Sequence, residues 1–158
     1  MITIRPSPTA DTRTCDVTKV SIDELLQSSI QHIEDVGKAM QFFALKIAEA
    51  ARVHDTDKIT DIDSFYADFQ TKFAQTAWWD RHRKLNRHHL NHPSGDGVPA
   101  DVNLIDVLDF IADCVMAGMA RSGSVYPLQL APEVLALAFR NTVDLLKAQV
   151  RVEAEVAQ

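Results

Sequence analysis

The stretch NLIDVLDFIADCVMAGMAR, residues 103–121, reads as a helix that is apolar on nearly every face. Asp106, Asp109 and Asp113 interrupt it, and at about 100° per residue their carboxylates fall within an arc of roughly 60°. A helix that is apolar on its other faces is normally buried. The acidic stripe is therefore expected to face either water or a group that balances its negative charge.

The other segments also space their apolar residues at helical intervals. Ser21 and Glu24 form a capping-box pattern ahead of an apolar periodicity that runs to Ala51, which predicts one long helix or two separated near Gly37. Shorter helices are expected over residues 62–73, 78–90 and 132–150, the last with Pro132 in its first turn. Two Pro and two Gly mark residues 91–101 as a loop. The sequence therefore predicts an all-α fold.

The expected architecture is a compact bundle of about five to six helices. We expect an N-terminal arm over residues 1–19 and a single helical domain over residues 20–158. Within the arm, MITIR is a possible short edge strand, and no further strand signal is evident.

Composition narrows the class of protein. The chain has 158 residues, 46% hydrophobic and 24% charged, which is ordinary for one globular domain with a substantial core. A net charge of −6 argues against binding a nucleic-acid backbone, which needs clustered Lys and Arg. Cys15 and Cys114 lie far apart, so a disulfide framework is not expected. No signal peptide or membrane span is indicated, and we expect a cytoplasmic protein.

The dipeptide His54-Asp55 follows an amphipathic helical stretch. It offers an imidazole nitrogen and a carboxylate oxygen from one point of the backbone, and both suit Zn, Mn, Fe or Mg ions. A polar pair at a helix end is more often simply solvated. Its interpretation therefore depends on what accompanies it.

A second group of histidines lies in residues 78–92. If residues 78–90 are helical, His82, Asn86 and His89 fall within about 60° of one another, beside two tryptophans. Such a half-buried face suits metal ligands or groups that position them. His88 points elsewhere unless the helix has already ended. The alternative is a surface helix that is merely rich in Arg and His.

Together with His32 on the first helix, these residues form an ordered set that resembles the HD-domain phosphohydrolase superfamily, whose pattern is H…HD…D. The last aspartate of that pattern often occurs as A-D-x-x-x-A, and residues 112–117, ADCVMA, match this form. The chain is more similar still to small phage and bacterial proteins of HD type, a group without an assigned activity. The matching elements span about residues 30–121 and are His32-Ile33, His54-Asp55-Thr56-Asp57-Lys58 and Trp79-x2-His82-x3-Asn86-x-His88-His89.

The superfamily resemblance implies a divalent metal ion bound by His32, His54, Asp55 and Asp113. A transition metal such as Mn, Fe, Co, Ni or Zn is expected rather than Mg. The metal would lower the pKa of a bound water and polarise a phosphoryl oxygen. Some nucleotidase members carry an acid three residues after the HD pair. Here Lys58 takes that position, and it either neutralises a phosphate or pairs with Asp55.

His32 poses a problem of distance. In one straight helix, the residues that separate it from His54 would span about 33 Å at about 1.5 Å per residue. Either the chain turns near Gly37 or within residues 41–45, or His32 is not a ligand in the same chain. It could then serve a neighbouring subunit, or be an ordinary core residue. In its absence, His89 or His82 is the expected replacement.

Other polar residues receive supporting roles. Asp109 is the candidate general base, or it orients a ligating histidine. Lys58 is the second candidate catalytic residue. Asp106 and Asp109 could instead pair with Arg83, Arg87 or Arg52. The residues expected to contact substrate are Arg52, His82, Arg83 and Asn86, with Arg87 as a further phosphate contact.

Three functions compete at this point. The first is a metal-dependent phosphohydrolase that acts on a nucleotide or another small phosphoester. The second is an all-α, Mg-dependent NTP pyrophosphatase, echoed by Asp106-x-x-Asp109, although the first helix has no E-x-x-E pair. The third is a non-enzymatic helical module with a structural metal or a buried His/Asp network. A homo-oligomer is plausible in each case, because small helical domains often bury an apolar face against a second copy.

Overall fold

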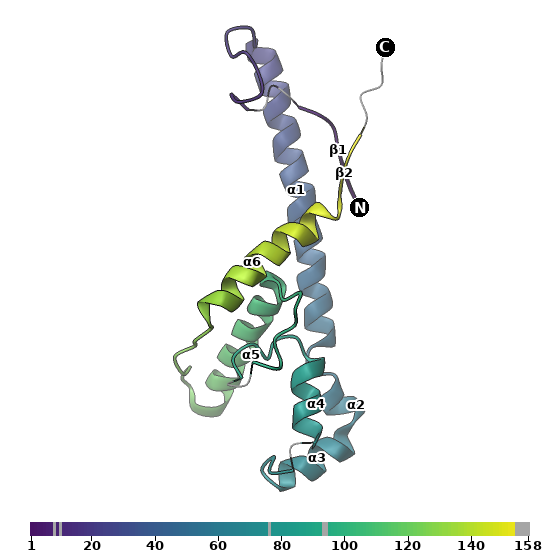
Figure 1. Cartoon of the computed structure of the whole chain (residues 1–158), viewed down its shortest axis with the longest axis vertical. Helices are drawn as coiled ribbons and strands as arrows, with labels where there is room; N and C mark the ends of the chain where they lie inside the picture. The colour runs from purple at the N-terminus through teal and green to yellow at the C-terminus, as the bar shows by residue number, and fades with distance from the viewer. Residues whose placement is uncertain (8, 10, 76, 93–94, 154–158) are drawn as a thin grey trace. The chain divides into compact units, whose positions relative to one another are not determined.

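The computed structural model describes the whole chain except residues 8, 10, 76, 93–94 and 154–158 (Figure 1). Helices dominate the described residues, which confirms the all-α prediction. No helix in these ranges is both long and apolar enough to cross a membrane. The elements, in chain order, are β1 (Ile2–Ile4), α1 (Ile22–Val53), α2 (Asp57–Thr60), α3 (Ile62–Gln70), α4 (Ala77–Leu85), α5 (Leu104–Ser122), α6 (Pro132–Lys147) and β2 (Val150–Val152).

The chain divides into two compact units, which we describe separately. The first unit contains residues 1–45 and those from 144 onward, and the second contains residues 46–143. This division differs from the expected arm over residues 1–19 and single domain over residues 20–158.

The first unit contains a parallel two-stranded sheet in which Ile2 pairs with Val150 and Ile4 with Val152. β1 is the short N-terminal strand that the sequence predicts. β2 corrects the prediction that the last helix runs to Val150, because α6 ends at Lys147. The alternating Val-Arg-Val of β2 suits an extended strand. Its pairing with β1 gives the backbone groups of both strands hydrogen-bond partners.

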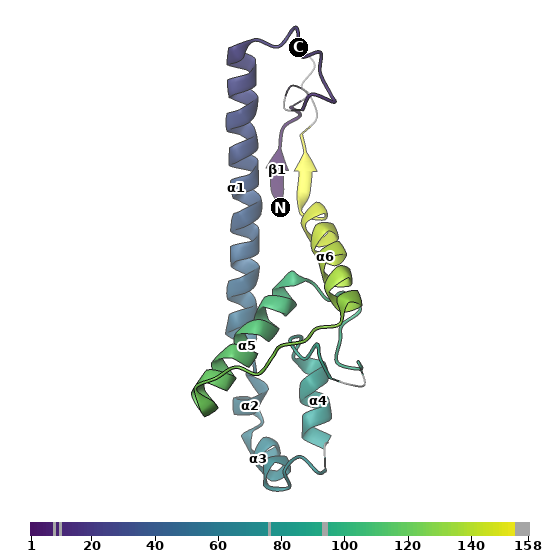
Figure 2. The same ribbon diagram turned by 90° about the vertical axis from the view of Figure 1, so that its left-hand side faces the viewer.

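Helix α1 begins with the predicted capping box. The Ser21 hydroxyl accepts a hydrogen bond from the Glu24 N–H at 3.2 Å, and the Glu24 carboxylate accepts one from the Ser21 N–H at 2.8 Å. Figures 1 and 2 show α1 as one uninterrupted helix, so it does not turn near Gly37. A Cβ added at Gly37 would meet nothing within 4 Å, so no close packing imposes a break there.

The core of the second unit is centred on α5, the first part of α6 and the loop before α5. Its buried apolar side chains are Leu90, Val102, Val107, Phe110 and Ala138. The Thr142 hydroxyl accepts a hydrogen bond from the Leu104 N–H at 2.8 Å, and the Asn141 side chain donates one to the Val102 carbonyl at 2.8 Å. These bonds attach the start of α5 to α6.

Helix α4 ends at Leu85, earlier than the prediction of a helix to residue 90. The Asn86 side-chain amide donates hydrogen bonds to the His82 carbonyl at 3.1 Å and to Asp57 at 3.0 Å. Asparagine side chains that bond locally in this way compete with the helical backbone pattern. His88 and His89 consequently lie in a turn after the helix.

Candidate metal centre

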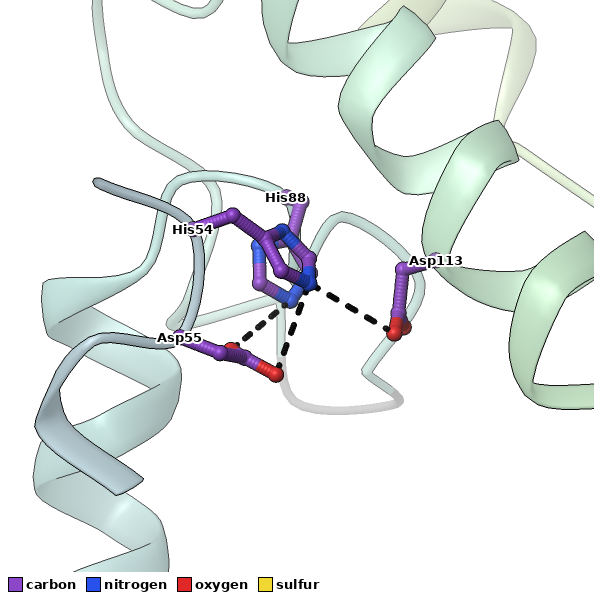
Figure 3. Close-up of side chains that lie close together, drawn as sticks. All are labelled: His54, Asp55, His88 and Asp113. Carbon is purple, nitrogen blue, oxygen red and sulfur yellow. Dashed lines mark ion pairs between the residues drawn. The ribbon is translucent and has the colours of Figure 1, made fainter. Parts of the chain in front are cut away.

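Four side chains converge in the second unit from three separate parts of the chain (Figure 3). His54 and Asp55 follow α1 directly, His88 lies in the turn after α4, and Asp113 is on α5. One potential ligand atom from each lies within 4.8 Å of the others. The tertiary structure thus brings the HD pair and the late aspartate of the sequence pattern together.

The backbone of Asp55 helps to form this arrangement. Its φ angle of 52° is in the left-handed region, which aspartate tolerates better than most residues. The side-chain carbonyl of Asn86 accepts a hydrogen bond from the Asp55 N–H at 3.2 Å and so supports the turn. The chain therefore leaves α1 with the Asp55 carboxylate beside the histidines.

The distances in the cluster suit shared coordination. The Nε2 atom of His54 lies 3.5 Å from an Asp55 carboxylate oxygen and 3.8 Å from one of Asp113, and the Nε2 of His88 lies 3.5 Å from the other Asp55 oxygen. Two ligands that each lie about 2.0–2.2 Å from one ion are roughly 3–3.5 Å apart. These contacts are therefore at or slightly above the separation that a common ion would set.

A second potential group adjoins the first and shares Asp55 with it. It consists of Asp55, His82 and His89, whose potential ligand atoms also lie within 4.8 Å of one another. The Nε2 of His82 lies 3.4 Å from Asp55 Oδ1, the same oxygen that is near His88. The Asp55 carboxylate thus lies between two sets of imidazoles.

Unpartnered atoms gather at these two groups. Within the described chain, buried Oδ1 of Asp55 and the Nε2 atoms of His82, His88 and His89 have no hydrogen-bond partner. A buried polar atom without a partner costs about 1–3 kcal/mol and is rare in folded proteins. Metal coordination would satisfy all four atoms at once, because each is a common ligand atom.

Carboxylates contact the opposite ring nitrogens of three histidines. Asp109 lies 2.8 Å from Nδ1 of His54 and 3.5 Å from Nδ1 of His88, and Asp57 lies 2.8 Å from Nδ1 of His82. A carboxylate at Nδ1 favours the tautomer in which Nδ1 carries the proton and Nε2 keeps its lone pair. This carboxylate–histidine arrangement is typical of metal-ligating histidines.

Burial keeps two of these histidines neutral. It lowers the pKa of His89 to about 3, with the neighbouring His88 and His82 adding to the effect. The pKa of His88 is also lowered, again chiefly by burial. Neutral imidazole is the form that binds a metal ion. Both rings are therefore in their ligand form at neutral pH.

Asp55, in contrast to these neutral histidines, is in its charged form at neutral pH. Its burial by itself would raise the pKa, but the opposing effects, led by the hydrogen bond and charge of Lys58, together hold the pKa below its usual value. The Lys58 ammonium forms an ion pair with the Asp55 carboxylate. Of the two roles foreseen for Lys58, the structure shows the pairing with Asp55.

His32 does not join the cluster. It is on α1 in the first unit, exposed beside the N-terminal arm. Because α1 has no turn between residues 32 and 53, about 30 Å of helix separates His32 from the end of α1. His88, expected to point elsewhere if the helix continued, takes part instead because α4 ends before it.

The residues expected to contact substrate have other surroundings. Arg83 is buried between Asp80 at 2.7 Å and Asp96 at 2.6 Å, which raise its pKa. His82 is buried within the second group, and Asn86 is buried beside it and hydrogen-bonded to the His82 carbonyl. Arg52 is exposed on the last turn of α1.

Asp106 has a structural role at the start of α5. Its carboxylate accepts a hydrogen bond from the Asn103 N–H at 2.8 Å as part of a capping box. It also pairs with Arg87, whose Nε and Nη2 both lie 2.8 Å from its oxygens. Of the three carboxylates in the acidic stripe, Asp106 therefore has an arginine partner, and Asp109 and Asp113 face the histidines.

Two members of the site were not assigned from the sequence. Asp57 enters the sequence pattern only as part of the HD motif, although its position two residues after Asp55 indicates a nearby carboxylate. His88 could have been found only by locating the end of α4, which depends on the hydrogen bonds of Asn86 to residues distant in sequence.

Comparison with known proteins adds no relative: no family model, curated protein or solved structure matches the chain. The resemblance to the HD-domain superfamily therefore rests on the sequence motifs alone.

Proposed function

We propose that this chain is a metal-dependent phosphohydrolase acting on a nucleotide or another small phosphoester. The observation that carries the proposal is the convergence of unpartnered buried ligand atoms on Asp55. These atoms are Asp55 Oδ1 and the Nε2 atoms of His82, His88 and His89. The order of the motifs in the sequence supplies the reaction class, and the donor set supports metal binding.

In this proposal, His54, Asp55, His88 and Asp113 hold the first ion. Asp109 keeps the protons of His54 and His88 on Nδ1, so it acts as a positioning residue, which revises its expected role as general base. When bound, the metal would supply Lewis acidity toward a phosphoryl oxygen and would acidify water. A donor set with several imidazoles favours Mn, Fe, Co, Ni or Zn over Mg.

The second group supports a site for two ions. Asp55, His82 and His89 adjoin the first group, and the Asp55 carboxylate contributes to both. Hydrolases that act on phosphoesters often use two neighbouring metal ions to stabilise the attacking and leaving oxygens. The donor geometry is thus compatible with one or two ions per chain, and metal stoichiometry distinguishes the two cases.

Substrate access is possible at the first group. The side chains of His54 and Asp113 are 27% and 31% exposed, whereas His82 is fully buried. A pocket next to His54 and His88 also includes Arg87, whose side chain is 41% exposed. A small phosphorylated molecule could therefore reach the first group, with Arg87 near its phosphate.

A structural metal site in a non-enzymatic module is the second candidate. The ion pairs of Lys58, Arg83 and Arg87 favour it, because each of these cations already contacts a carboxylate of the same chain. The NTP pyrophosphatase alternative receives less support, since Asp106 is engaged by the α5 capping box and by Arg87.

The deciding experiment measures metal content and turnover in the same preparations. The full chain is reconstituted with Mn, Fe, Co, Ni, Zn or Mg, analysed for bound metal, and assayed for phosphate release from a nucleotide and phosphomonoester panel. We expect tight binding of a transition metal and hydrolysis of at least one substrate. Metal binding without turnover would favour the structural module, and absence of binding would refute both.

Matched histidine variants locate the ligands. His88→Ala is expected to lose metal and activity, whereas His32→Ala keeps both because it lies in the other unit. Loss of metal in His32→Ala but not in His88→Ala would instead support His32 as the ligand, as the superfamily pattern implies. Circular dichroism shows whether each variant retains its helices.

A further inference from the structure

The apolar face of α1 in the first unit is exposed to solvent. Within residues 22–45, seven large apolar side chains between 41% and 86% exposed lie on one side of the helix. They are Ile22, Leu25, Leu26, Ile30, Ile33, Val36 and Met40. At 100° per residue they occupy an arc of about 140°. A face of this kind on a helix is normally covered by another element.

The polar side of the same helix contacts the N-terminal arm. The Gln31 side chain donates a hydrogen bond to the Arg5 carbonyl at 2.8 Å, and Lys38 donates one to the Thr3 carbonyl at 3.3 Å. Ser28, on this side, is buried and hydrogen-bonded to Thr9. The arm therefore attaches to the polar side and leaves the apolar side exposed.

The apolar residues follow a heptad repeat with one polar member. Residues 22, 26, 29, 33, 36, 40 and 43 alternate in steps of four and three, and all are apolar except Ser29. This spacing is that of the a and d positions of a coiled coil, at which apolar side chains of one helix insert between those of another. A heptad seam is self-complementary, because a second copy presents the same residues at the same spacing.

Charge and area also favour a second copy. The positions beside the seam are largely apolar or small, including Leu25, Ile30, Gly37 and Ala44, so two identical helices would meet little like-charge repulsion. Apolar side chains of this class each carry on the order of 100 Å² of apolar area. With the flanking residues, two copies would remove roughly 1,000 Å² from water, the level that a specific interface should reach.

We propose that two copies of this chain form a dimer through the heptad seam of α1, residues 22–43. The interface is isologous, as in most two-fold dimers, with the same residues contributed by both protomers. The arm-contacting side of α1 and the metal centre of the second unit are not required for it.

Sedimentation equilibrium of the full chain tests the proposal. The wild type is expected to be a dimer at micromolar concentration. Ile33→Glu and Met40→Glu each place a charge in the seam and should weaken association by at least about 100-fold. Leu45→Glu is the matched control, because Leu45 is an exposed apolar residue of the same helix but lies off the seam. Its dimer should be unchanged.

A cross-linking measurement guards against loss of folding in the charged variants. In a Cys15→Ser, Cys114→Ser background, Ile33→Cys should form a disulfide-linked dimer on mild oxidation, and Leu45→Cys should form much less. A wild type that is monomeric throughout the concentration range, or equal effects at positions 33 and 45 in both experiments, would overturn the proposal.

Discussion

At the scale of single residues, the contacts at Nδ1 of the histidines decide which nitrogens remain to bind a metal. Asp109 contacts Nδ1 of both His54 and His88, and Asp57 contacts Nδ1 of His82. In each case the Nε2 atom is left facing the Asp55 carboxylate. The carboxylates therefore act on the site through the histidines.

Replacing Asp109 tests this role. Asp109→Asn removes the negative charge that holds the Nδ1 proton of two histidines, and we expect metal affinity to fall about 10–100-fold, as is usual for such partners. Competition with a chelator of known affinity measures the change. Asp144→Asn is the control, since Asp144 is an exposed aspartate on α6 near Lys147. An unchanged affinity in Asp109→Asn would show that the contact does not position the ligands.

The depressed pKa values of His88 and His89 predict a pH dependence for the metal-free protein. An unfolded histidine titrates near 6.5, whereas folded His89 titrates at about 3. Between these pH values the unfolded state binds more protons than the folded state, so the fraction of unfolded protein increases as pH falls. Stability should be fully present above pH ~6.5 and should decrease below it, by up to about 1.4 kcal/mol per pH unit for each such histidine.

Urea denaturation at a series of pH values in the presence of a chelator measures this effect. His89→Gln should flatten the dependence between pH ~6.5 and the range where carboxylates titrate. A dependence of the same slope in this variant and in the wild type would contradict the assignment to His89.

At the scale of elements, the end of α4 determines the composition of the site. Asn86 bonds to the His82 carbonyl, to Asp57 and to the N–H of Asp55, so it links the helix end to the HD segment. Had the helix continued, His88 would have been directed away from His89. The end of α4 thus brings His88 into the site, whereas the uninterrupted helix α1 keeps His32 away from His54.

Asn86→Ala should reveal this linkage. The substitution leaves Asp57 Oδ1 and the Asp55 N–H without their partner, and we expect a loss of about 1–3 kcal/mol in unfolding free energy. Metal affinity should fall as well, because the turn that carries His88 loses a constraint. Asn91→Ala, at an exposed position in the following loop, is the control and should change neither quantity. Equal stability of the two variants would show that Asn86 does not stabilise the turn.

At the scale of the whole molecule, the chain consists of two compact units that carry different features. The second unit holds the candidate metal centre, built from the residues after α1, the turn after α4 and helix α5. The first unit holds the paired strands and the exposed seam of α1. Metal binding and self-association are thus expected to be separable properties.

Metal removal is expected to destabilise the second unit. A ligand that binds only the folded state at about 100 times its Kd adds roughly 2.7 kcal/mol, so a chelator should lower Tm measurably. Differential scanning calorimetry with and without metal tests this. His32→Ala should show the same shift as the wild type, and Asp55→Asn should show little or none. A Tm insensitive to metal in the wild type would contradict the proposed site.

Features formed by residues close together in the sequence could be predicted from the sequence. Ser21 and Glu24 identify the start of α1 because a capping box lies within one helical turn, and its bonds form as predicted. The apolar periodicity likewise predicts α1, α3 and α5 from contacts between near neighbours in sequence. The HD pair and the acidic stripe of α5 can also be recognised from the sequence, because the spacing of their residues is set within one backbone segment.

The membership of the site depends on interactions between distant parts of the chain. Asp109 meets His54 through a hydrogen bond that spans 55 residues, Asp57 is hydrogen-bonded to His82, and His88 lies 3.5 Å from the Asp55 carboxylate. Such contacts leave no period in the sequence, because each depends on where an intervening helix ends and how the segments pack. The sequence by itself determined the helical class and the residue types that could bind a metal. Only the tertiary structure decided that His88 joins them and His32 does not.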